Sequence, residues 1–277
     1  GALAEQLLEA LDAAGTAVGR YSIVEVSAEL RARQRERLAR FGTRVRWLDA
    51  WPQAGAAPMR GVVIGNELLD AMPVQLLHFD GCDWFERGVV QRAGGFAFED
   101  RPTPLRPPIE DADNWFAAGT TIEIHPQAQA FVRTLAQQLE RGAAFFIDYG
   151  FPEAEYYHPQ RTGGTLMCHR DHRADTDPLA DVGAKDITAH IDFTAIALAG
   201  QDAGLAVLGY TSQAHFLFNC GFGALLEAAA GDVRTLAHAQ KLVTEHEMGE
   251  LFKVIGFVAG PSFDAIGFRN GDRTHRL

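Results

Sequence analysis

The chain has 277 residues, of which 47% are hydrophobic and 22% are charged, a composition typical of a folded globular protein and not of a disordered one. Its 25 basic and 36 acidic side chains give a net charge of −11, which disfavours nucleic acid and anionic membrane surfaces as partners. The three cysteines are far apart in the chain, which excludes a disulfide framework and favours a reducing compartment.

The first part of the chain alternates between helical and strand patterns. Leucines at helical spacing predict a helix that ends before Gly15, and Ser27 is a suitable N-cap for a second helix. Apolar runs predict buried strands at 21–26, 45–48 and 61–65. Helices and strands in this order indicate an α/β fold with a parallel sheet.

The pattern then changes twice. Segments 75–79, 84–90 and 96–99 predict antiparallel strands joined by turns. The segment 150–185 has no periodicity, which is typical of either a functional lid or a disordered region. Pro126 is placed to open a helix that runs to Arg141. The remaining predictions are strands at 143–148, 205–210 and 251–257 and helices at 192–201, 222–230 and 232–244.

Polar side chains follow four of the predicted strands. In open α/β sheets, ligands bind beyond the carboxyl ends of the strands. Glu25 is suited to accept hydrogen bonds from the vicinal hydroxyls of a ribose, and Gly1 precedes it by ~24 residues, near the spacing of nucleotide-binding loops. Asp49 is a weaker candidate for the adenine side. A helix-initiating role for Glu25 and a turn role for Asp49 are the structural alternatives.

One motif is more specific. The run Asn-Glu-Leu-Leu-Asp-Ala-Met-Pro-Val at 66–74 resembles the N/H-E-F/L-F/L-D-x-L/M-P-V signature of the MidA family. The blocks at 123–126, 147–150, 183–193, 213–217 and 248–253 resemble further family motifs in the same order. MidA proteins are class I S-adenosylmethionine-dependent methyltransferases, and their mitochondrial members resemble protein-arginine methyltransferases that serve assembly of respiratory complex I.

The resemblance implies a fold and a domain plan. The expected fold is a single Rossmann-like methyltransferase domain over 1–277, with a mostly parallel seven-stranded sheet whose last strand is antiparallel. Insertions at about 76–106 and 150–185 would form the substrate side. The family's E-x-G-x-G-x-G loop would end at Gly1, so most of that loop falls outside these 277 residues.

The resemblance also implies roles for the residues at the strand ends. S-adenosylmethionine would lie across Gly1, with its ribose on Glu25 and its adenine near Asp49 and Ala50. Asn66 would lie near the methionine end of the cofactor and beside the reacting groups.

The acceptor needs carboxylates if it is a guanidinium. Glu67 and Asp70 are three residues apart, so on a helix they would share one face, with Glu67 toward the substrate and Asp70 in support. Asp148 and Tyr149 would line the same pocket. Each of these four residues also has a structural alternative, such as capping or bracing a loop.

Several alternatives stay open from the sequence. The His-containing run 168–172 is read as a loop and not as a metal site, and no metal is expected. The fold is also compatible with a protein-binding assembly factor that has lost catalysis, or with a nicotinamide-dependent oxidoreductase. The expected partner is a protein substrate, in the cytoplasm for a bacterial-type member or in the mitochondrial matrix for a eukaryotic one.

Overall fold

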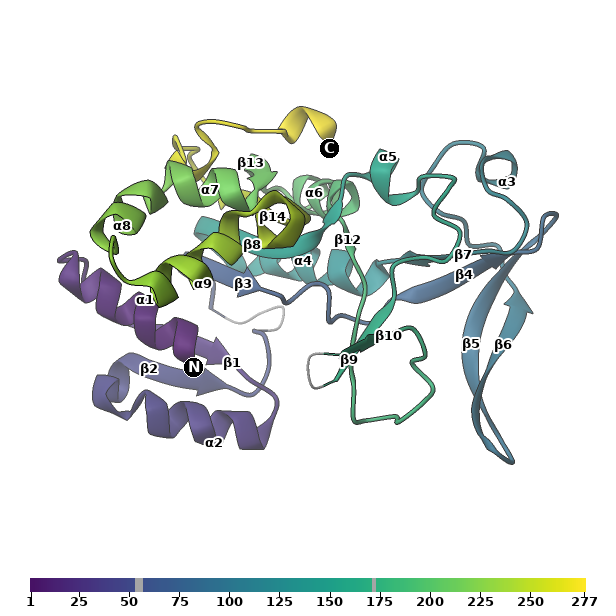
Figure 1. Ribbon diagram of the computed structural model, residues 1–277, viewed down its shortest axis with the longest axis horizontal. Coiled ribbons are helices and arrows are strands. Elements are labelled where there is room, and N and C mark those ends of the chain that lie inside the picture. The colour runs from purple at the N-terminus through teal and green to yellow at the C-terminus, as the bar shows by residue number, and fades with distance from the viewer. Residues whose placement is uncertain (53–56, 171–172) are drawn as a thin grey trace. The chain divides into compact units, whose positions relative to one another are not determined.

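The computed structural model describes residues 1–52, 57–170 and 173–277 (Figure 1). The chain divides into two compact units, residues 1–56 and residues 57–277, and each is described by itself. Within the described residues, no helix is long and apolar enough to cross a lipid bilayer.

The first unit contains a pair of parallel strands and two α-helices. Its elements are α1 (Ala2–Ala13), β1 (Tyr21–Val24), α2 (Ala28–Arg37), the 3-10 helix η1 (Ala39–Arg44) and β2 (Val45–Leu48). Strand β1 pairs in parallel with β2, as the alternating pattern predicts. The Ser27 hydroxyl accepts the Leu30 N–H at 3.3 Å, which confirms the predicted cap of α2. Leu8 and Leu38 are fully buried between the helices and the strands.

A five-stranded sheet forms the centre of the second unit. Its strands are β3 (Met59–Asn66), β8 (Leu139–Phe151), β12 (Ile191–Asp192), β13 (Ala206–Ser212) and β14 (Phe252–Ala259). Strands β3 and β12 pair in parallel with β8, whereas β14 lies antiparallel to both β8 and β13. The last strand is therefore antiparallel, as expected. Strands β1 and β2 form a two-stranded sheet within the first unit, and the single seven-stranded sheet stays a prediction.

Helices cover both faces of this sheet. Successive side chains of β8 point to opposite faces, so each face presents apolar side chains to a helix. Phe146 contacts Phe131 of α4 (Pro126–Gln138) on one face, and Phe145 contacts Phe216 of α7 (Gln213–Asn219) on the other. Helix α6 (Phe193–Asp202) also covers the Phe146 face, and its Gly200 leaves no room for a Cβ beside Phe257. Asp192 accepts the Ala195 N–H at 3.1 Å, which confirms the predicted N-cap of α6. The other helices are α3 (Ala112–Trp115), α5 (Glu153–Tyr156), α8 (Phe222–Ala228), α9 (Val233–Val243), the π-helix η2 (Glu245–Gly249) and the 3-10 helices η3 (Ile266–Phe268) and η4 (Thr274–Arg276).

The region after β3 forms a second sheet, which is entirely antiparallel. Its order is β6-β5-β4-β7, from β4 (Gln75–Phe79), β5 (Trp84–Arg92), β6 (Gly95–Pro102) and β7 (Thr120–Ile124). The first three strands match the predicted antiparallel segments, and β7 is an addition. In Figure 1 the β5–β6 hairpin extends away from the other strands of the second unit. Trp84 is buried beneath this sheet.

Two predicted features of the second unit are wrong. The helix that opens at Pro126 ends at Gln138 and not at Arg141, because Leu139 to Gly142 already pair with β3. The segment 150–185 is not free of regular structure. It contains α5 and the strands β9 (Met167–Arg170) and β10 (Arg173–Asp175), which form a small antiparallel sheet with β11 (Asp186–Thr188).

Candidate active site

The turn that follows β3 carries the first candidate residues. Asn66 ends the strand, and Glu67 adopts a left-handed backbone with φ of 48°. The Glu67 N–H donates to the carbonyl of Ile147 at 2.9 Å, which fixes the turn against β8. A non-glycine residue in this conformation is uncommon and stores strain, which is typical of functional turns.

Asp148 holds this turn from the neighbouring strand. Its Oδ2 accepts the backbone N–H groups of Leu68, Leu69 and Asp70 at 3.2, 2.9 and 3.2 Å, and its Oδ1 accepts the Tyr149 N–H at 3.0 Å. The Asp148 side chain is 1% exposed. Burial, and next the nearby charge of Asp70, raise the pKa of Asp148 to about 7, although its backbone hydrogen bonds oppose the shift. Asp148 therefore positions the turn and is not itself open to a substrate.

Asp70 and Tyr149 form a buried pair beside this turn. The Tyr149 hydroxyl donates to Asp70 Oδ2, and the Asp70 carbonyl accepts the Ala189 N–H at 3.1 Å. Burial raises the pKa of Asp70, while the hydrogen bond from Tyr149 lowers it. Burial and the bond to Asp70 raise the pKa of Tyr149 as well, so Tyr149 stays a neutral donor.

The predicted common face for Glu67 and Asp70 is wrong. Residues 67–72 form a turn and not a helix, so the two carboxylates point into different surroundings. Glu67 is exposed, and its Oε1 accepts a hydrogen bond from the Asn66 amide at 3.0 Å, whereas Asp70 is 4% exposed. Glu67 is thus the accessible carboxylate of the turn, and Asp70 and Asp148 support it.

The candidates for the ribose and the adenine, Glu25 and Asp49, lie in the first unit and follow its two strands. The Glu25 N–H donates to the carbonyl of Leu48 at 3.4 Å, which places the end of β1 beside the end of β2. Arg31 donates to both the Glu25 carbonyl and the Asp49 carboxylate. The Arg31 hydrogen bond is the main cause that lowers the pKa of Asp49. Glu25 and Asp49 are therefore brought together.

These residues fit an adenosine moiety. Each Glu25 oxygen accepts one internal hydrogen bond, from the Ser27 N–H at 2.9 Å and from the Gln34 amide at 2.8 Å. A carboxylate oxygen has a second lone pair, so both remain able to accept from a ribose diol. Val26 is 83% exposed directly after Glu25 and offers apolar surface to a base. Gly1 and Ala50 are also exposed.

Sequence reasoning assigned no site role to Glu123, although this residue begins one of the family blocks. The Glu123 side chain is 1% exposed and accepts the N–H groups of Thr165 and Leu166, each at 2.9 Å, and the Tyr156 hydroxyl at 3.0 Å. It therefore ties the segment before β9 to the end of β7. Of the run 168–172, Asp171 and His172 lie outside the described residues.

The parallel strand ends, the antiparallel last strand and the polar turn after β3 define a methyltransferase-like α/β fold. The chain belongs to the family described as "Putative S-adenosyl-L-methionine-dependent methyltransferase", which matches residues 1–211. The cofactor of that family is S-adenosylmethionine, and the match agrees with the resemblance to MidA proteins.

Solved structures support the same assignment. The chain is 50% identical to a COG1565 superfamily member from Burkholderia thailandensis that was solved bound to S-adenosyl-homocysteine, with a TM-score of 0.89 over 99% of this chain and 73% of that one. A native structure of a COG1565 superfamily protein from the same organism gives the same identity and TM-score, with 75% of that chain covered.

A curated relative is more distant. The chain is 24% identical over 195 residues to "Protein arginine methyltransferase NDUFAF7 homolog, mitochondrial" from Caenorhabditis elegans. The match covers 68% of this chain and 43% of that protein, so the chain spans less than half the length of this relative.

Proposed function

We propose that this chain transfers a methyl group from S-adenosylmethionine to a protein side chain, and that the acceptor is an arginine guanidinium. The observation that carries the proposal is the turn after β3, in which Asp148 fixes the backbone and leaves the Glu67 carboxylate exposed. The family match supports the reaction, and the name of the Caenorhabditis elegans relative supports the acceptor.

The chain's own residues would act mainly by positioning. Bound S-adenosylmethionine supplies an electrophilic methyl group. Glu67 would bind the acceptor guanidinium through charge-assisted hydrogen bonds and hold its nitrogen in line for attack. Proximity and orientation of this kind can lower a barrier by roughly 7–11 kcal/mol. Because the turn is anchored by Asp148, Glu67 would need little reorganisation to do so.

Cofactor binding is tested first, by calorimetric titration of the full-length protein with S-adenosylhomocysteine. A charged hydrogen bond contributes about 1.5–3 kcal/mol, so we expect Glu25→Ala to raise the Kd roughly 10- to 100-fold. The matched control is Glu29→Ala, because Glu29 is an exposed residue of α2 and should leave the Kd unchanged. Equal affinities of the wild type and Glu25→Ala would reject the ribose assignment.

Methyl transfer is tested with a labelled methyl group on arginine-containing protein fractions. We expect Glu67→Gln to lower kcat about 100-fold while the affinity for S-adenosylhomocysteine stays the same. Glu110→Gln, at another exposed position, should match the wild type. Label on lysine instead of arginine would overturn the acceptor and leave the cofactor assignment intact.

The MidA resemblance adds an expectation about the partner, namely a protein of the respiratory complexes. Methylation of such a subunit would disappear in cells that carry Glu67→Gln in place of the wild-type chain. Intact cofactor binding without any transfer would instead support the alternative of a catalytically inactive assembly factor.

A further inference from the structure

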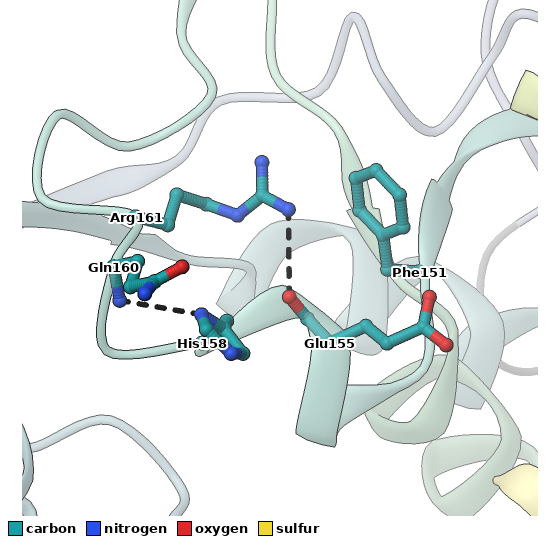
Figure 2. A pocket seen from close by; sticks show the side chains of 5 residues that line it. All are labelled: Phe151, Glu155, His158, Gln160 and Arg161. Carbon is teal, nitrogen blue, oxygen red and sulfur yellow. Dashed lines mark hydrogen bonds between the residues drawn. The ribbon is translucent and has the colours of Figure 1, made fainter.

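A cavity of about 490 Å³ lies beyond the carboxyl end of β8. Phe151, Glu155, His158, Gln160 and Arg161 line it, as Figure 2 shows. Phe151 is the last residue of β8, and the other four come from α5 and the segment that follows it. The cavity therefore belongs to the same edge of the sheet as the turn held by Asp148, but none of the predicted site residues lines it.

Arg161 is the cation of this cavity, and its guanidinium is poorly satisfied. The guanidinium carbon lies 4.7 Å from the ring centre of Phe151, and Nη2 donates to the Glu155 carbonyl over a long 3.4 Å (Figure 2). Among the described residues, the buried Nε has no hydrogen-bond partner. A buried donor left unsatisfied costs about 1–3 kcal/mol, so a movement of the side chain that brings Nε to a ligand oxygen would be favourable.

The other charges around the cavity do not neutralise Arg161. The Glu155 carboxylate already pairs with Arg276. Lys253 is a second cation, and its ammonium nitrogen lies 6.0 Å from the centre of the Phe151 ring, which Arg161 also contacts. The Glu250 carboxylate lies 3.6 Å from this ammonium nitrogen. The cavity consequently favours an anion over a cation, and the planar guanidinium fork matches a carboxylate.

The cavity connects to the turn through aromatic contacts. Tyr149, which binds Asp70, lies 5.1 Å from His190 between ring centres, and His190 lies 5.4 Å from Phe151. Burial, and next the charges of Arg161 and Lys253, lower the pKa of His190 to about 4, so its ring is neutral at pH 7. Ring contacts therefore connect the Asp70–Tyr149 pair beside the turn to the aromatic ring on which Arg161 lies.

We propose that the Arg161 cavity binds a carboxylate of the substrate protein, supplied by an acidic residue close to the residue that is methylated. This inference rests on the proposed function. The substrate cation would go to Glu67 and not into the cavity, because Arg161 repels it.

The test is an NMR titration of the full-length protein that observes the Arg161 Nε–H signal. The probes are N-acetyl-glutamate methylamide and its glutamine counterpart, with glutarate and inorganic phosphate as further ligands. We expect the acidic amide to bind at least about tenfold more tightly than the neutral one. Arg161→Gln should abolish this preference, and Arg161→Lys should weaken it about tenfold, because lysine keeps the charge and loses the fork. Arg133→Gln, at an exposed position of α4, should bind as the wild type does.

Three results would overturn the inference: equal binding of the two amides, unchanged binding by a folded Arg161→Gln or Arg161→Lys variant, or tighter binding of phosphate or glutarate than of the acidic amide. Titration of the same samples with S-adenosylhomocysteine separates the two proposals. Normal binding of S-adenosylhomocysteine without the carboxylate preference rejects the Arg161 site alone. No binding of S-adenosylhomocysteine rejects the proposed function, whatever the amides do.

Discussion

At the scale of single residues, two opposing effects act on the pKa of Asp148. It accepts four backbone N–H groups, which favour its ionised form, yet it is buried beside Asp70, which favours its neutral form. Burial has the larger effect, and the pKa of Asp148 is raised to about 7. The folded state then holds a proton that the unfolded state releases near pH 4, so ionisation of Asp148 destabilises the fold.

This sign gives a pH prediction. As the pH rises from 6.5 to 8, Asp148 loses its proton in the folded state and the free energy of unfolding falls by about 1 kcal/mol from this group. Asp192, whose pKa burial also raises to about 7, adds a similar fall. We expect urea unfolding of Asp148→Asn to show a smaller fall in the free energy of unfolding over this pH range. The remaining fall would come from Asp192. Parallel curves for the wild type and the variant would contradict the shifted pKa.

Tyr149 provides a second prediction at this scale. Its hydroxyl lowers the pKa of Asp70 against the effect of burial, so Tyr149→Phe should raise that pKa further. We expect the acid limb of the methylation rate to move to higher pH, with a loss of about 1–2 kcal/mol in stability.

The control for this change is Tyr157→Phe. The Tyr157 hydroxyl is also buried and donates to the Glu123 carbonyl at 3.2 Å, so its loss should cost similar stability without a shift of the acid limb. A shift in both variants would show that the effect comes from general loosening and not from Asp70.

At the scale of elements, Glu123 links the small sheet of β9, β10 and β11 to the strand β7. Gly164 makes this contact possible, because it has φ of 71° and a Cβ there would lie 2.3 Å from Glu123 Oε1. In Glu123→Gln, one acceptor oxygen becomes an NH₂ group. The Thr165 N–H donates to both carboxylate oxygens, so the NH₂ faces it in either orientation, and the Leu166 N–H loses its charged acceptor. We expect a loss of about 1–3 kcal/mol and faster hydrogen exchange at those two amides.

An exposed carboxylate supplies the comparison for Glu123. Glu99 of β6 pairs with Arg92 of β5 and with Arg101 of β6, where solvent screens the interaction. Glu99→Gln should therefore change stability by less than about 1 kcal/mol and leave the amides of Thr165 and Leu166 unchanged. Equal exchange rates in Glu123→Gln and the wild type would show that other contacts hold the segment.

Element ends that depend on residues nearby in the sequence could be predicted, and those that depend on residues far away in the sequence could not. The caps at Ser27 and Asp192 and the start of α4 at Pro126 depend on neighbours within a few residues, and the structure confirms them. The end of α4 depends on β3, which lies about 80 residues earlier in the chain, so helical periodicity extended it too far. The strands β9 and β10 have only four and three residues, too few for an alternating pattern to predict them.

The candidate site was also predictable only in part. Position at a strand end was enough to select Asn66 and Glu67, and the family motif added Asp70. The role of Asp148 was not predictable, because it depends on three backbone groups 78 to 80 residues away. The separation of Glu67 from Asp70 was missed because the positive φ of Glu67 turns the chain where a helix was assumed.

At the scale of the whole molecule, the net charge of −11 opposes the compact state. The exposed ion pairs, such as Arg60–Glu140 and Arg92–Glu99, do little to offset it, because exposed pairs contribute about 0–1 kcal/mol each. The excess carboxylates repel one another over longer distances than those within an ion pair. Salt weakens this repulsion beyond the Debye length, which is ~10 Å in 0.1 M salt.

Salt should therefore stabilise this protein at pH 8. Between 20 and 300 mM NaCl we expect an increase of about 1 kcal/mol in stability, which corresponds to about 2–4 °C in Tm for a chain of this size. The increase should disappear near pH 5.3, the isoelectric point, because the net repulsion vanishes there. Thermal unfolding at both pH values, followed by circular dichroism, measures the difference. A fall of Tm with salt at pH 8 would mean that the surface ion pairs stabilise the fold more than the net charge destabilises it.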